Sequence, residues 1–148
     1  MGNTTTPFIV VPASWRDLWA VRRVENLCFN DDAWPLPDIM AVLVWPGIIR
    51  LKAAIGTTLV GFASAETRGR VGWITTLGVL PDYRRKGIAR FLLLKCENYL
   101  NSQRVQLCVR RSNISAQQLY LQMDYRQIDV WKRYYRGGED ALVMEKDR

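Results

Sequence analysis

Apolar and polar residues alternate along this chain with two different periods, and these periods predict its secondary structure. Apolar residues recur every three or four positions, as on one face of a helix, over residues 14–29, 38–45, 87–101 and 115–123. Short apolar or alternating runs of the kind that form strands occupy residues 8–11, 48–55, 59–67, 71–79, 104–109, 125–132 and 141–146. The elements therefore follow the order β-α-α-β-β-β-α-β-α-β-β.

That order predicts a mixed α/β (α+β) fold, in which helices flank a central sheet that is mostly antiparallel. Short turns at residues 56–58 and 69–70 join neighbouring strands as hairpins. A helical crossover joins the strands on either side of the 87–101 helix, and such a crossover gives a parallel pair. No linker, repeat or low-complexity segment interrupts the 148 residues, so we expect one domain over residues 1–148.

Composition and charge narrow the possible functions. Lys and Arg outnumber Asp and Glu by 21 to 14, and the resulting net charge of +7 suits a polyanionic cofactor or a nucleic acid. The chain has no histidine, and its three cysteines lack the spacing of a metal site, so we expect no metal. Because the sequence contains neither an apolar run of membrane length nor the core of a signal peptide, we expect a cytoplasmic protein with free thiols.

The most informative segment runs from a buried strand into a basic, glycine-containing turn and then directly into the long helix. The first turn of a helix carries free backbone N–H groups and the positive end of the helix dipole, and both bind phosphate. Arg84, Arg85 and Lys86 add positive charge there, and Gly87 lets a ligand approach the backbone closely. The segment therefore predicts a phosphate-binding turn.

Three motifs resemble those of the GCN5-related N-acetyltransferases, and the resemblance covers nearly the whole chain. Residues 84–89, Arg-x-x-Gly-x-Ala, are similar to the acetyl-coenzyme A signature of that family. Residues 109–120 (VRRSNISAQQLY) are similar to its second cofactor motif. Tyr-Tyr at 134–135 and Glu-Asp-Ala-Leu-Val-Met at 139–144 resemble the end of ribosomal-protein alanine and protein N-terminal acetyltransferases. Residues 124–125 depart from the pattern, with Asp-Tyr where Gly-Phe is usual.

The resemblance implies acetyl-coenzyme A as the cosubstrate. In the family, backbone N–H groups of the turn hold the pyrophosphate, and a bulge at the end of the preceding strand, which Gly78 would suit, frees backbone groups for the pantetheine arm. That strand end could equally be an ordinary buried one, and Asn113 could simply cap the helix that follows it. The contacts expected from the resemblance are Leu77, Gly78, Val79, Arg84, Arg85, Lys86, Gly87, Ile88, Ala89, Arg90 and Asn113.

Acetyl transfer from a thioester to an amine needs a neutral amine and an acid that protonates the departing thiolate. Tyr120 is our candidate acid, because a phenol with a pKa of about 10 stays protonated at neutral pH. Its place in the apolar stripe of its helix would also suit a plain core tyrosine. Where the ribosomal-protein enzymes carry a glutamate base, this chain has Cys108, and a neutral thiol is a poor base. Glu66 is a candidate base, as are the loop acids Asp31 and Asp32 or a bound water.

Four aromatic residues are candidates for the acceptor site: Trp34, Trp73, Tyr134 and Tyr135. In the related enzymes the last hairpin, with its tyrosine pair, covers the peptide; each aromatic residue could also serve only in packing.

We therefore expect an acetyl-coenzyme A-dependent N-acetyltransferase, a monomer or homodimer, that acts on the α-amine of a protein or peptide by direct attack on the thioester. Two alternatives stay open. One is an enzyme for small amines such as polyamines, aminoglycosides or amino acids, and the other is a non-catalytic module that binds coenzyme A or nucleic acid.

Overall fold

The computed structural model describes residues 7–148. The expectation that the chain has no signal-peptide core rests partly on residues 1–6, which lie outside this range. The strands are β1 (Ile9–Pro12), β2 (Ile49–Ile55), β3 (Thr58–Arg68), β4 (Val71–Val79), β5 (Arg104–Arg110), β6 (Arg126–Trp131) and β7 (Ala141–Asp147). The helices are α1 (Leu18–Phe29), α2 (Leu36–Val44), α3 (Ile88–Leu100) and α4 (Ile114–Gln122), with short 3-10 turns η1 (Trp15–Asp17), η2 (Asn30–Asp32) and η3 (Pro81–Tyr83). Strands and α-helices follow the predicted order.

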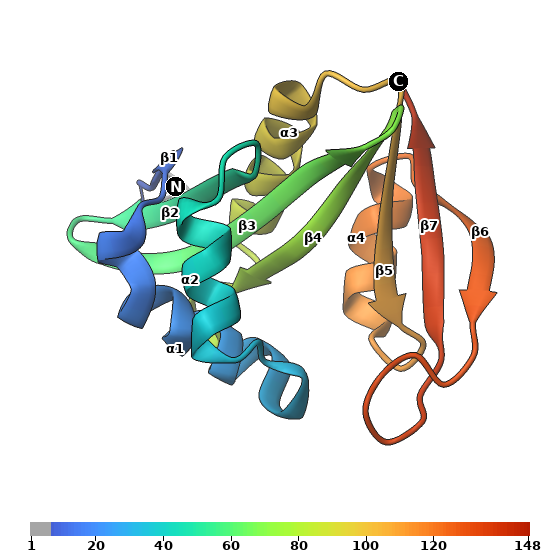
Figure 1. Ribbon diagram of the computed structural model, residues 1–148, viewed down its shortest axis with the longest axis horizontal. Helices are drawn as coiled ribbons and strands as arrows, with labels where there is room; N and C mark the ends of the chain where they lie inside the picture. The colour runs from blue at the N-terminus through green and yellow to red at the C-terminus, as the bar shows by residue number, and fades with distance from the viewer. Residues whose placement is uncertain (1–6) are drawn as a thin grey trace, which may run out of the picture.

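The seven strands form one sheet in the order β1-β2-β3-β4-β5-β7-β6 (Figure 1). Every neighbouring pair is antiparallel except β4 and β5, which are parallel. This parallel pair lies on either side of α3 in the sequence, as the crossover rule predicts.

The parallel pair is short, and its strands separate. β4 and β5 are paired only from Val71 to Ile74 on the β4 side, and Figure 1 shows them diverging beyond that point. A bulge in β4 marks the place where they part: Ser64 pairs with Thr76 and Ala65 with Ile74, so Thr75 is the extra residue. Within residues 7–148, the edge of β4 that faces β5 therefore has no strand partner after Ile74.

The position of this bulge corrects the expectation that it would lie at Gly78. Gly78 pairs regularly with Phe62 of β3. A Cβ atom at Gly78 would lie 3.2 Å from Cys28 Sγ and 3.3 Å from Val24 Cγ1, both on α1. Glycine is needed there because helix α1 packs closely on the strand, and the bulge forms three residues earlier.

Helices cover both faces of the sheet. Val21 and Val24 of α1 pack with Leu43 of α2 and Phe62 of β3 in one apolar cluster. The other face carries α3 and α4, whose buried side chains share a second cluster with β2 to β5 and β7: Leu92, Leu93 and Cys96 from α3, and Tyr120 from α4. α1 and α4 therefore lie on opposite sides of the sheet. Among residues 7–148, no helix combines the length and the apolar character needed to cross a membrane.

Candidate active site

The separation of β4 and β5 opens a cleft that passes through the sheet. This main cleft has a volume of about 540 Å³, and its lining includes Glu25 and Cys28 from α1 as well as Ala116 and Tyr120 from α4. Because α1 and α4 cover opposite faces, the main cleft connects the two sides of the sheet. A second cavity of about 390 Å³, which we call the aromatic cavity, adjoins it. The two share the lining residues Asp32, Trp34, Ile74, Thr75, Cys108, Tyr135 and Arg136.

The turn before α3 has the geometry of an anion site. Gly87 is the N-cap of α3 with a φ of 81°, and no side chain of the described residues caps this helix end. The first bond of the helix joins Phe91 N to Gly87 O at 3.1 Å, so the N–H groups of Ile88, Ala89 and Arg90 have no intrahelical partner. A Cβ atom built on Gly87 would meet nothing within 4 Å, so the approach to these N–H groups is open. The predicted phosphate turn can therefore accept an anion.

Arg84 differs from the other basic residues of this turn. Its Nε donates to Val79 O at 2.9 Å, and its terminal nitrogen lies 3.6 Å from Cys28 Sγ. The guanidinium is thus directed at the end of β4 and at α1. Arg84, Arg85 and Lys86 are all exposed residues. Arg84 therefore ties the turn to the end of β4 and to α1, and its contact with a cofactor stays a prediction.

The other predicted cofactor residues lie along the path from the turn to the main cleft. Leu77 and Asn113 line the cleft, and Gly78 and Val79 lead from Leu77 toward the turn. Asn113 Oδ1 accepts from Ala116 N at 3.2 Å, so this side chain also caps α4. The unpaired edge of β4 runs between the turn and the cleft. These residues fit a long ligand with an anionic group at one end, such as acetyl-coenzyme A.

Tyr120 lines the main cleft from α4, and it also belongs to the core. Tyr120 is 7% exposed, and its ring packs edge-on against Tyr125 with the ring centroids 5.9 Å apart. The Tyr120 hydroxyl makes no hydrogen bond to another residue of the described chain. Burial raises the pKa of this phenol to about 12, so the hydroxyl keeps its proton at neutral pH and can donate it within the cleft.

Neither of the two side chains at the expected base positions is suited to the role. Glu66 lines neither cavity, and its Oε1 accepts from Arg68 Nε at 2.8 Å. Cys108 does line both cavities, but burial raises the pKa of its thiol to about 11. Cys108 is therefore a neutral thiol at neutral pH, and the structure does not bring Glu66 to the cleft.

Glu25 is a site residue that the sequence did not single out. It is 2% exposed and lines the main cleft. Its Oε2 accepts from Trp34 N at 3.2 Å, and no Lys or Arg of the described residues forms an ion pair with it. Burial raises its pKa to about 7. The sequence feature that could have indicated its burial is its place beside the apolar stripe of α1, one position after Val24 and three before Cys28.

The four predicted acceptor residues come together in the aromatic cavity, where Trp34, Trp73, Tyr134 and Tyr135 all form part of the wall. Trp73 stacks on Trp131 with ring centroids 5.9 Å apart. Trp131 contacts Tyr134 at 5.4 Å, and Tyr134 contacts Tyr135 at 5.0 Å. A continuous row of rings from β4 to the loop between β6 and β7 thus borders this cavity.

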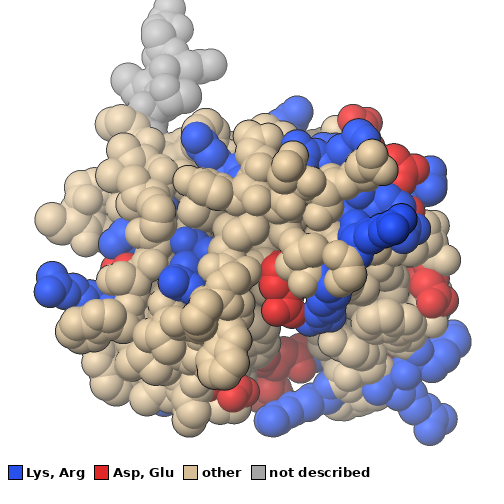
Figure 2. Space-filling view, turned by 45° about the horizontal axis from the view of Figure 1, so that its top comes forward, with Lys and Arg blue, Asp and Glu red and all other residues tan. Residues whose placement is uncertain are grey.

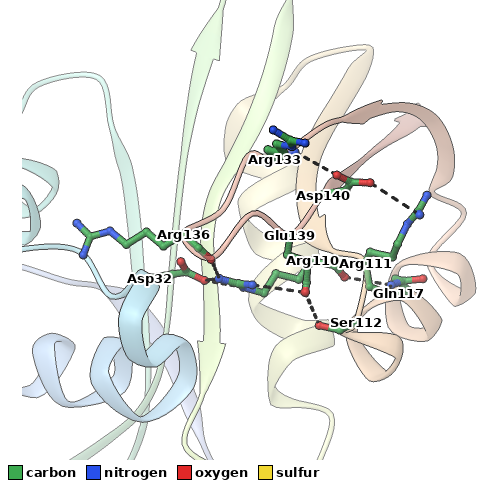
Figure 3. A network of polar contacts seen from close by, with 9 residues as sticks. All are labelled: Asp32, Arg110, Arg111, Ser112, Gln117, Arg133, Arg136, Glu139 and Asp140. Atoms are coloured by element: carbon green, nitrogen blue, oxygen red, sulfur yellow. Dashed lines mark hydrogen bonds and ion pairs between the residues drawn. The ribbon is translucent and has the colours of Figure 1, made fainter.

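An ion-pair network joins the two loops beside the cleft. Asp32 of η2 pairs with Arg110 at the end of β5, and the two side chains point toward each other in Figure 3. Arg110 also pairs with Glu139 at 3.4 Å and lies over the ring of Tyr135 at 4.5 Å. The loop after α1 is therefore held against the loop between β6 and β7, and together they border the aromatic cavity.

Basic residues elsewhere do not form one continuous tract on the face shown in Figure 2. Lys and Arg side chains lie there in several groups, with Asp and Glu between them. A duplex needs a row of cations along its backbone. This face therefore offers little support for the nucleic-acid alternative.

Comparison with known proteins agrees with this geometry. Residues 15–125 match the acetyltransferase (GNAT) family. The chain is 34% identical to N-alpha-acetyltransferase RimI of Mycobacterium tuberculosis, over 99% of this chain and 97% of that protein. The fold is similar to the ribosomal-protein-S18-alanine N-acetyltransferase of Escherichia coli (TM-score 0.84, 22% identity, 95% and 94% of the two chains). It is also similar to Arabidopsis thaliana NAA60, solved with a bisubstrate analogue (TM-score 0.86, 20% identity, 96% and 99%). The predicted fold is confirmed, and the chain belongs to the acetyltransferase (GNAT) family.

Proposed function

We propose that this protein transfers the acetyl group of acetyl-coenzyme A to the α-amine at the N-terminus of a protein or peptide. The observation that carries the proposal is the through-sheet cleft, which opens into an aromatic cavity, has a proton donor in its wall and begins at Leu77, on the strand that leads to the anion-binding start of α3. The relative from Mycobacterium tuberculosis is named an N-alpha-acetyltransferase, which supports an α-amine as the acceptor. We expect a cytoplasmic enzyme that works as a monomer or homodimer.

Acetyl-coenzyme A supplies the activated thioester, and the chain supplies binding and proton transfer. The free N–H groups at the start of α3 bind the pyrophosphate, with Arg85 and Lys86 beside it. The unpaired edge of β4 offers N–H and C=O groups to the amides of the pantetheine arm. These contacts place the reactive end near Leu77, where the main cleft passes through the sheet.

Tyr120 then protonates the sulfur as the C–S bond breaks. A phenol whose pKa is raised by burial is fully protonated before the reaction. Burial disfavours the departing thiolate as it does the phenolate, and the proton that the amine nitrogen loses can return to the phenol as the sulfur is protonated. We therefore assign Tyr120 as the general acid.

The acceptor enters from the other side of the sheet. The aromatic cavity opens into the main cleft, so a peptide whose first side chain lies against Trp73 and Tyr134 presents its terminal amine near Thr75. Tyr and Trp side chains suit such a site, since they are large, rigid and able to pack on many kinds of side chain.

The test is a panel of acceptors assayed with acetyl-coenzyme A, with release of the free thiol of coenzyme A as the readout. The panel contains peptides with free N-termini, the same peptides with blocked N-termini, polyamines, aminoglycosides and amino acids. We expect turnover with the free peptides alone. Turnover with a small amine and none with the peptides would replace this function with small-amine acetylation.

A further inference from the structure

We infer that Glu25 is the general base that removes a proton from the acceptor ammonium. The inference rests on the proposed function, and it concerns a residue that packs on the buried face of α1. The family resemblance points to the Cys108 position for a base, and a neutral thiol stands there. The reaction still needs a neutral amine, so the base has to come from elsewhere in the cleft or from solvent.

The carboxylates that line the main cleft differ in their surroundings. They are Glu25, Asp31 and Asp32. Asp32 is held by Arg110, and Asp31 is exposed on η2. Glu25 alone is buried with no cation beside it. Its only hydrogen bond in the described chain is the one that Oε2 accepts from Trp34 N at 3.2 Å, so Oε1 is open to a proton from the acceptor or from one intervening water.

The place of Glu25 on α1 brings it to the correct side of the cleft. Cys28 follows it by three residues, on the same face of the helix, and the Cys28 thiol donates to Val79 O at 3.3 Å. This face of α1 therefore lies against the end of β4, where the unpaired edge runs. Trp34, whose N–H contacts Glu25, is part of the wall that the main cleft shares with the aromatic cavity.

The protonation behaviour of Glu25 also suits a base. Burial raises its pKa to about 7, close to the value of about 8 for a peptide α-amine. Proton transfer between two groups of similar pKa costs little free energy in either direction. An exposed carboxylate, with an ordinary pKa near 4, would be a much weaker base toward an ammonium.

The protons balance as follows. One proton moves from the acceptor ammonium to Glu25, the amine nitrogen forms the C–N bond with the acetyl carbon, and the C–S bond breaks. The sulfur takes the Tyr120 proton, and the second proton lost from the nitrogen restores the phenol. Glu25 returns its proton to solvent through the open cleft. The products are the acetylated amine, free coenzyme A and one proton.

The first part of the test needs no substrate. A carbon-13 NMR titration of the glutamate carboxyl groups in the protein alone should show one that titrates near pH 7, and Glu25→Gln should remove that signal. A Glu25 that titrates in the ordinary range near pH 4 would overturn the inference, because such a carboxylate would not be poised as a base.

The second part measures kcat against pH at saturating acetyl-coenzyme A and peptide. We expect Glu25→Gln to lower kcat at pH 7 by about 10²–10⁴-fold, with a rate that keeps rising with pH as hydroxide and the free amine replace the base. The Gln amide oxygen can still accept from Trp34 N, so the loop keeps its support. Glu25→Asp, which keeps a carboxylate, should retain part of the rate and the wild-type form of the profile.

Glu66→Gln is the matched control, since it makes the same change at a glutamate outside both cavities, and it should follow the wild-type profile. An unchanged profile in Glu25→Gln would overturn the inference while the wild-type enzyme still acetylates peptides. A wild-type enzyme that acetylates no peptide would instead overturn the proposed function. The deficit of Glu25→Gln should also shrink with a peptide whose amine has a lower pKa; a deficit that stays constant would overturn the assignment of Glu25 as the base.

Discussion

Replacing Glu25 with Gln should change how the stability of the folded protein depends on pH, with no substrate present. Burial raises the pKa of Glu25 from 4.5 to about 7, whereas in the unfolded chain the carboxyl is hydrated and has its ordinary value. Below about pH 4.5 the group is neutral in both states and adds no penalty. Between the two pKa values the unfolded chain releases the proton and the folded protein keeps it, so the free energy of unfolding falls as pH rises.

The size of this effect follows from the two pKa values. Each pH unit between them is worth about 1.4 kcal/mol, so the interval from 4.5 to about 7 corresponds to about 3 kcal/mol. Above pH 7 the carboxylate is charged in both states, and the loss is complete. This is a large part of the stability of an ordinary domain, which is about 5–15 kcal/mol.

Urea denaturation of wild type and Glu25→Gln, at a series of pH values from about 4 to about 8, measures the difference. Gln is neutral throughout, and the other titrating groups are the same in both proteins, so their contributions cancel in the difference. We expect the variant to gain about 3 kcal/mol relative to wild type across this range. A difference that stays constant with pH, or a variant that loses stability relative to wild type as pH rises, would refute the burial argument.

Three further substitutions test other parts of the site. Gly87→Glu should abolish the rise in melting temperature that acetyl-coenzyme A gives; Gly87→Ala, which shares the cost of a positive φ but adds no charge, should keep that rise. Tyr120→Phe should lower kcat by about 10²–10⁴-fold and leave stability near wild type, since no hydrogen bond of the described chain is lost; a fully active variant would remove Tyr120 from the mechanism. Tyr134→Ala should raise KM for a peptide and leave the affinity for acetyl-coenzyme A unchanged; a weaker cofactor affinity would instead place this loop on the cofactor side.

The sequence predicted the elements and the parallel pair well because long apolar stripes and a helical crossover leave few arrangements open. The 71–79 run, for example, is the observed extent of β4. The four aromatic acceptor candidates also lie in one cavity. They come from three separate segments, and the family resemblance rather than periodicity brought them together.

The sequence could not predict details that depend on how two elements meet. Gly78 was predicted to form a bulge, but its missing side chain makes room for α1. The sequence around Gly78 does not reveal which helix will pack against it. The fold also brings two acceptors to the Arg84 side chain, the carbonyl of Val79 and the sulfur of Cys28, and neither contact could be read from the sequence around Arg84. Glu25 was overlooked because a charged residue on an amphipathic helix is usually solvated, and its burial appears only when the α1 loop folds back over it.

The most direct test of the proposed function is the position of the acetyl group on a product. The purified protein is incubated with acetyl-coenzyme A and a peptide that has a free N-terminus and one internal lysine, and the product is analysed by tandem mass spectrometry. We predict a single acetyl group on the α-amine, formed by the wild-type protein and lost with Gly87→Glu. Acetylation of the lysine side chain alone, or an unmodified peptide while a small amine is acetylated, would contradict α-amine transfer.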